Sequence, residues 1–259
     1  MPTPRVLVLR APGTNCDRET AFAFEQAGAQ ATLRHINRWL ENPALPRDFQ
    51  ILCIPGGFSY GDDIAAGRIL ANQIRHHLRE AIAEFQAAGK LILGICNGFQ
   101  VLIKSGFLVS DDERGALATL AWNDSGRYED RWVQLSVEGE RCVFLQGVRT
   151  LYLPVAHAEG KFVARDEATL SDLARRGQLV LRYTGRARRA DGQVPYPENP
   201  NGSQANVAGM CDPSGRVLGM MPHPERHIDP TQHPRWTRGE AGERGDGFVI
   251  FQNAVRYFA

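Results

Sequence analysis

The strongest chemical signature in the chain surrounds Cys96, in the pentapeptide Gly-Ile-Cys-Asn-Gly at residues 94–98. An apolar, strand-like run precedes this segment and a helical pattern follows it. A nucleophile on a strand-to-helix turn needs glycine neighbours, because the strained turn closes only where no Cβ obstructs it. The helix N-terminus favours a thiolate and directs amide N–H groups towards a developing oxyanion. The segment therefore predicts a nucleophilic cysteine, and the alternative is an ordinary turn with a small buried hydrophobe.

A thiolate nucleophile also needs a residue that transfers protons, and His223 is the best candidate. It lies in Met-Pro-His-Pro-Glu, directly after an apolar run. Pro224 favours extended backbone at His223, where side chains two residues apart project to the same side. Glu225 can then orient the ring and stabilise the imidazolium. Cys96, His223 and Glu225 form a candidate triad.

His157 and Glu159 repeat the same His-x-Glu spacing. Spacing alone does not choose between the two pairs, but His157 lacks flanking prolines. We therefore prefer His223 as the base. We expect His157 at the edge of the site or in a contact with a partner protein.

The other cysteines lack the glycine turn that surrounds Cys96. Cys16 also follows a strand-like run, but no glycine follows it at the required spacing. We expect the remaining cysteines to be core or incidental residues, namely Cys53, Cys142 and Cys211.

A second glycine-rich turn follows the apolar run at residues 50–55. Gly56 and Gly57 allow the backbone to approach a ligand closely, and in a parallel sheet this turn would lie beside the cysteine. We expect the N–H groups of Gly57 and Asn97 to hold an oxyanion. The turn lacks the spacing of a nucleotide-binding loop.

These turns require a framework of buried strands. Three continuous apolar runs, at residues 5–10, 50–55 and 90–96, are typical of strands covered on both faces in a parallel sheet. Helical patterns at 17–28 and 64–89 separate them. We therefore predict an α/β fold with a doubly wound, mostly parallel central sheet flanked by helices. Runs at 131–138, 151–157, 178–184 and 217–221 indicate additional antiparallel strands, and residues 248–258 indicate a final helix.

Composition narrows the functional class. With 30 basic and 29 acidic residues the net charge is +1, which argues against nucleic acid or an acidic membrane surface as the partner. Five scattered cysteines provide neither a paired framework nor a metal-binding spacing. No apolar stretch reaches the roughly 20 residues of a membrane helix, and none forms a secretory leader. We expect a cytoplasmic protein without a metal. We expect one domain over residues 1–259, with polar loops at 186–203 and 229–247.

Together, the motifs after the second and third apolar runs and the Pro-His-Pro-Glu segment resemble the class I, triad-type glutamine amidotransferases. Six segments that span most of the chain are more specifically similar to the glutaminase subunits of phosphoribosylformylglycinamidine synthase: APGTNCDRE (11–19), IPGGFSYGDD (54–63), GICNGFQ (94–100), PVAHAEGKF (154–162), NPNGS (199–203) and GMMPHPER (219–226).

This resemblance implies that Cys96, His223 and Glu225 hydrolyse glutamine and release ammonia. It also implies that Gln100 and the turn of Gly56 and Gly57 line the glutamine pocket. A synthetase partner, with a small bridging subunit, would use the ammonia and ATP to make formylglycinamidine ribonucleotide in purine synthesis. The resemblance implies no cofactor in this chain, with ATP and magnesium on the synthetase. The sequence departs from the family pattern at Ala11, where an aromatic residue is usual, and in a longer segment at 231–245.

Two other functions fit some of the same residues. A standalone cysteine hydrolase of the same fold, cleaving peptides or γ-glutamyl bonds, would use the same triad without a partner. A non-catalytic regulatory subunit would need neither Cys96 nor His223.

Overall fold

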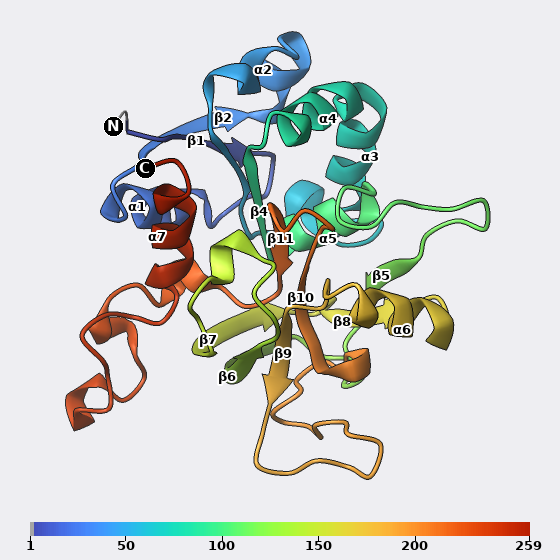
Figure 1. Cartoon of the computed structure of the whole chain (residues 1–259), viewed down its shortest axis with the longest axis vertical. Coiled ribbons are helices and arrows are strands. Elements are labelled where there is room, and N and C mark those ends of the chain that lie inside the picture. Colours follow the sequence, from blue (N-terminus) through green and yellow to red (C-terminus); the bar gives the residue numbers. More distant parts are fainter. Residues whose placement is uncertain (1–2) are drawn as a thin grey trace.

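A nine-stranded sheet forms the centre of the computed structural model, which describes residues 3–259 (Figure 1). Its strands are β1 (Arg5–Arg10), β2 (Gln30–His35), β3 (Ile51–Ile54), β4 (Leu91–Ile95), β6 (Glu129–Val137), β7 (Thr150–His157), β9 (Leu181–Thr184), β10 (Val207–Cys211) and β11 (Val217–Met220). They lie in the order β2-β1-β3-β4-β11-β10-β9-β6-β7. Pairing is parallel from β2 to β11 and antiparallel from β11 to β7.

Helices cover both faces of the parallel part of the sheet (Figure 1). On one side α1 (Asp17–Gln26) packs against α7 (Phe248–Arg256), and on the other α3 (Arg68–His77) packs against α5 (Asn97–Lys104). This arrangement explains why every residue of β3 and β4 is buried. A strand with helices on both faces has no solvent side, so its residues read as a continuous apolar run. The predicted doubly wound fold with added antiparallel strands is confirmed.

Several elements differ from the prediction, each for a local reason. The helical pattern at 64–89 forms two helices, α3 and α4 (Arg79–Ala87), because the chain bends at Leu78 (φ −124°, ψ 11°). Strand β2 was not predicted, since it is a half-exposed edge strand with few apolar residues. Strand β10 was also missed, because its small residues give a weak strand signal. The other unpredicted elements are α2 (Ile36–Glu41), α6 (Glu167–Arg175) and the two-stranded sheet of β5 (Ala118–Ala121) and β8 (Lys161–Ala164).

The strand order brings three chemically important turns to one edge of the sheet. Strand β4 lies between β3 and β11 and is parallel to both. The carboxyl ends of parallel strands meet at the same edge. The glycine turn after β3, Cys96 after β4 and His223 after β11 therefore lie close together, as the sequence predicted for the first two. No helix within residues 3–259 has the length and apolar character needed to cross a bilayer.

Gly98 provides a direct test of how tightly this edge is packed. A Cβ at this position would lie 1.8 Å from the carbonyl oxygen of Ile54, a backbone atom that cannot move without disturbing β3. We expect Gly98→Ala to lower the free energy of unfolding by about 3 kcal/mol or more, as measured by urea denaturation. Gly242→Ala is the control, because a Cβ there makes only an ordinary contact at 3.5 Å. Equal stability of the two variants would contradict the packing.

Candidate active site

Cys96 occupies a strained turn at the N-terminus of α5. Its backbone has φ 51° and ψ −103°, outside the regions that residues other than glycine usually adopt. The turn is held by a hydrogen bond of 2.7 Å from Cys96 N to the carbonyl oxygen of Met220 in β11. Gly94 is required as well, because a Cβ there would lie 2.5 Å from Leu102 Cδ1. The glycine on each side of Cys96 therefore has the steric role that the sequence predicted.

The Cys96 sulfur is buried at the beginning of α5. Its relative exposure is 4%, and it lies 3.6 Å from the carbonyl oxygen of Ala156 in β7. The first amides of a helix have no partner within the helix and carry the positive end of the helix dipole. The position of Cys96 therefore favours negative charge on the sulfur and on an oxygen bound beside it.

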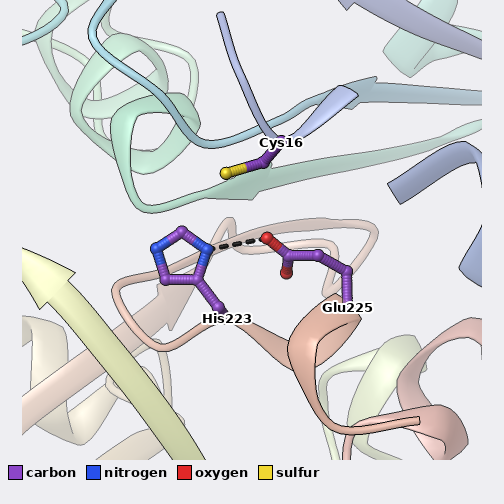
Figure 2. A group of neighbouring side chains, drawn as sticks. All are labelled: Cys16, His223 and Glu225. Carbon is purple, nitrogen blue, oxygen red and sulfur yellow. Dashed lines mark hydrogen bonds and ion pairs between the residues drawn. The ribbon is translucent and has the colours of Figure 1, made fainter. Parts of the chain in front are cut away.

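His223 and Glu225 form a buried pair (Figure 2). His223 Nδ1 lies 2.7 Å from Glu225 Oε1, and the side chains are 2% and 0% exposed. Burial alone would lower the pKa of His223, but the charges of Glu225 and Cys96 outweigh it and raise this pKa well above its ordinary value. The pair therefore favours an imidazolium.

The second ring nitrogen of His223 is available for chemistry. Among the described residues, Nε2 has no hydrogen-bond partner although it is buried. Glu225 holds Nδ1, which leaves Nε2 to accept or donate a proton. The charge of Cys96 contributes to the raised pKa of His223, so its sulfur lies near this ring. The predicted nucleophile, base and orienting carboxylate are thus brought together.

The glycine turn after β3 lies against the same ring. A Cβ at Gly56 would lie 2.7 Å from His223 Cε1, so only glycine fits there. The backbone of Gly57 has φ +143°, and Ser59 N donates to Asn97 Oδ1 at 3.2 Å. The turn is therefore fastened to the N-terminus of α5, next to Cys96. A joint oxyanion site of the Gly57 and Asn97 amides stays a prediction.

Gln100 is part of an internal hydrogen-bond network. Its Oε1 accepts from Asn97 Nδ2 at 2.9 Å, and its Nε2 donates to the carbonyl oxygen of Glu159 at 2.6 Å. Lys104 extends the network to Glu159 at 3.5 Å. Both polar atoms of Gln100 are thus engaged within the protein. That Gln100 lines the glutamine pocket stays a prediction, and a direct hydrogen bond from its side chain to a ligand would require one of these bonds to be exchanged.

Comparisons with known proteins agree with this geometry. Residues 3–258 match the CobB/CobQ-like glutamine amidotransferase domain. The chain belongs to this glutamine amidotransferase family. It is 48% identical to the phosphoribosylformylglycinamidine synthase subunit PurQ of Dehalococcoides mccartyi, over 98% of this chain and 97% of the relative. It is 41% identical to the PurQ subunit of a Methanococcus maripaludis strain, over 98% and 97%.

A solved structure gives the same relationship. The chain superposes on a chain of the PurLQS structure from Thermotoga maritima with a TM-score of 0.73 and 32% identity. The match covers 99% of this chain and 100% of that one. The resemblance inferred from the six motifs is therefore confirmed.

In this family member His157 lies inside the protein and not at an exposed edge. Its ring is 2% exposed, Nδ1 lies 3.1 Å from Asn123 Oδ1, and Gly160 packs directly on the ring. Burial, followed by the charge of His223, lowers the pKa of His157 to about 3. The ring is therefore neutral at pH 7 and supports the site from within. A direct partner contact by His157 would require it to become exposed.

Two tyrosines whose pKa values respond to Cys96 lie outside the motifs found in the sequence. Burial and the charge of Cys96 raise the pKa of Tyr183, whose hydroxyl accepts from Asn201 Nδ2 at 3.1 Å. Tyr128, exposed at the surface, has a pKa raised by burial and by Cys96, and its ring lies 6.3 Å from that of Phe58. These side chains reach the site through tertiary packing. Their neighbours Asn201 and Phe58, in contrast, belong to the NPNGS and IPGGFSYGDD segments that the sequence singled out.

Cys16 is the further residue that the structure adds to the site. Its sulfur, a ring nitrogen of His223 and a carboxylate oxygen of Glu225 all lie within 4.8 Å of one another (Figure 2). Two cysteines therefore approach one imidazole, whereas the sequence had indicated only Cys96 at the site.

The neutral state of His157 predicts a pH dependence of stability. Its folded-state pKa is about 3 against an ordinary value of 6.5, so the unfolded chain binds more protons between these values. The stabilisation is complete above pH 6.5 and is lost as the pH falls towards 3. We expect His157→Gln to reduce the loss of stability between pH 7 and 4.5 by about 2 kcal/mol, measured by urea unfolding.

The matched control is His76→Gln, at an exposed position in α3. This variant should keep the acid sensitivity of the parent. His223, whose raised pKa acts in the opposite direction, is present in all three proteins. If His157→Gln lost as much stability as the parent on acidification, His157 would not be buried in its neutral form.

Proposed function

We propose that Cys96, His223 and Glu225 hydrolyse glutamine to glutamate and ammonia, and that a partner synthetase uses the ammonia. The observation that carries the assignment is the buried His223 ring, with Nδ1 fixed by Glu225 and Nε2 unpartnered among the described residues. A ring in this state beside the sulfur of Cys96 is equipped to transfer protons.

The reaction follows from these positions. The Cys96 thiolate attacks the side-chain carbonyl carbon of glutamine, and the Gly57 and Asn97 amides stabilise the oxyanion. His223 gives its proton to the departing nitrogen, and ammonia leaves as the glutamyl thioester forms. His223 then takes a proton from water, which attacks the thioester. Collapse of the second oxyanion expels the Cys96 thiolate and leaves His223 protonated, as at the start. The product carboxyl group loses its proton and departs as glutamate.

Cys96 is a better nucleophile than Cys16 for physical reasons. Burial raises the pKa of the Cys16 thiol to about 11, so it stays protonated near neutral pH. Its sulfur accepts a hydrogen bond from Arg226 at 3.1 Å and donates to Asn15 at 3.2 Å. Cys96 has the strained turn and the oxyanion donors beside it. The thioester should therefore form on Cys96.

The destination of the ammonia follows from the family. Relatives of this chain are subunits of phosphoribosylformylglycinamidine synthase, and one structure holds a relative as part of PurLQS. We assign the acceptor as formylglycinamide ribonucleotide, converted to the amidine with ATP in purine biosynthesis. ATP and magnesium would bind the synthetase, and a small subunit would bridge the two. We assign residues 1–259 to one glutamine amidotransferase domain that works in the cytoplasm without a cofactor or metal.

Replacement of the nucleophile tests this function in the reconstituted complex with the synthetase and bridging subunit. We expect Cys96→Ala to reduce glutamine-dependent amidation by at least about 10³-fold, because no thioester can form. Amidation with added ammonium should stay at the parental rate. Cys142→Ala, which removes a buried thiol outside the site, should keep both activities. Glutamine-dependent amidation that persisted in Cys96→Ala would overturn the assignment.

Glutamate release, measured with and without the synthetase, distinguishes this function from that of a standalone cysteine hydrolase. That enzyme would cleave its substrate at full rate without the synthetase. We expect glutamate release to be coupled to amidine formation in the complex.

The carboxylate of the triad gives an independent test. We expect Glu225→Gln to lower kcat for glutamine by about 10² to 10⁴-fold with little change in KM, because the imidazolium loses its orienting charge. The rate at which iodoacetamide alkylates Cys96 at pH 7 should fall in parallel. Glu113→Gln, at an exposed position, is the control. Parental kcat in Glu225→Gln would remove Glu225 from the mechanism.

A further inference from the structure

Cys16 ends a segment whose backbone pairs with the glycine turn of the active site. Thr14 and Gly57 form an antiparallel bridge. A Cβ at Gly57 would lie 2.8 Å from Asn15 N, so the two segments are in close contact. The hydrogen bonds run from Cys16 N to Gly56 O at 3.3 Å, from Phe58 N to Gly13 O at 3.0 Å and from Tyr60 N to Pro12 O at 2.7 Å.

The Cys16 side chain joins this pair of segments to the triad. It is 1% exposed and points towards the His223 ring (Figure 2). Arg226, the residue after Glu225, donates from Nη2 to the sulfur at 3.1 Å and from Nε to Glu19 at 3.0 Å. The sulfur therefore has a fixed place between the first turn of α1 and the segment that carries the base.

The glycine turn packs closely against both the sulfur and the imidazole. A Cβ on Gly56 would lie 3.1 Å from Cys16 Sγ and 2.7 Å from His223 Cε1. The glycine turn, the sulfur and the imidazole are thus in mutual contact.

We propose that Cys16 is a positioning residue that sets the distance between the oxyanion turn and the proton-transferring ring of His223. This inference rests on the proposed function of both groups. The thiol touches the base and, through its backbone, the turn that carries Gly57. Because burial raises its pKa and keeps the thiol protonated, Cys16 adds no charge beside the imidazolium.

Cys16→Ala tests the role in the reconstituted complex. Loss of the sulfur leaves a gap beside His223, and a misplacement of about 1 Å can cost up to 10²-fold in rate. We expect kcat for glutamine to fall at least about 10-fold with KM changed by less than about 3-fold. Amidation with ammonium should be unchanged, which verifies folding and docking of the variant.

The pH dependence of kcat/KM distinguishes a positioning role of Cys16 from a role in packing alone. Cys16 is one of the contacts that raise the pKa of His223, so its removal should move the alkaline limb of kcat/KM to lower pH. Ionisable groups that act on the ring or on Cys16 are Glu225, Cys96, His157, Tyr128 and Arg226. All of them are retained in the variant. Cys16→Ser, which keeps a hydroxyl near the sulfur position, should restore part of the rate and of the shift.

Arg226→Lys provides a second variant in case Cys16→Ala folds poorly. It keeps the positive charge but loses the planar guanidinium that binds both Cys16 and Glu19, and it should shift the alkaline limb in the same direction. Cys211→Ala, at a buried thiol in β10, is the control. Parental kcat and pH profile in both Cys16→Ala and Arg226→Lys would overturn the positioning role. If Cys96→Ala stayed active, the proposed function itself would fail instead.

Discussion

The hydrogen bond of 2.7 Å between His223 and Glu225 is the interaction on which the chemistry of this chain depends. Both groups are buried, and an isolated charge would be strongly unfavourable there. The opposite charges of the carboxylate and the imidazolium offset the unfavourable burial of each group. The backbone N–H of His223 donates to the carbonyl oxygen of Pro154 in β7 at 2.8 Å. The fold thus pairs two groups that would be unfavourable as isolated buried charges, in a place where one of them can exchange a proton with Cys96.

Parallel pairing of β3, β4 and β11 places this pair beside the nucleophile. Cys96 N bonds to the end of β11, so the strand that leads to the base also fixes the strained turn of the thiol. The side chains of Cys96 and His223 therefore share one backbone framework. Movement of β11 would alter both the position of the ring and the conformation of the turn.

The glycine turns, the His223 segment and the buried strands could be predicted from the sequence, because each depends on residues that are neighbours in the chain. The glycines around Cys96 are needed for steric reasons within one turn, and Pro224 restricts the backbone conformation of His223. Continuous apolar runs in the sequence indicated the buried strands. Edge strand β2 and the glycine-containing β10 were missed, because one is half exposed and the other is built from small residues. Cys16 and His223 are 207 positions apart in the chain, so no local sequence pattern could predict their contact.

The order of the elements along the chain also affects when the activity arises. The nucleophile lies before the midpoint of the sequence, whereas the base follows β11, which enters the sheet between β4 and β10. A chain emerging from the ribosome therefore contains its reactive thiol long before it can use it. Under the proposed function, a chain that lacks β11 and the residues after it has the thiol but not the base, so glutamine hydrolysis requires the complete central sheet.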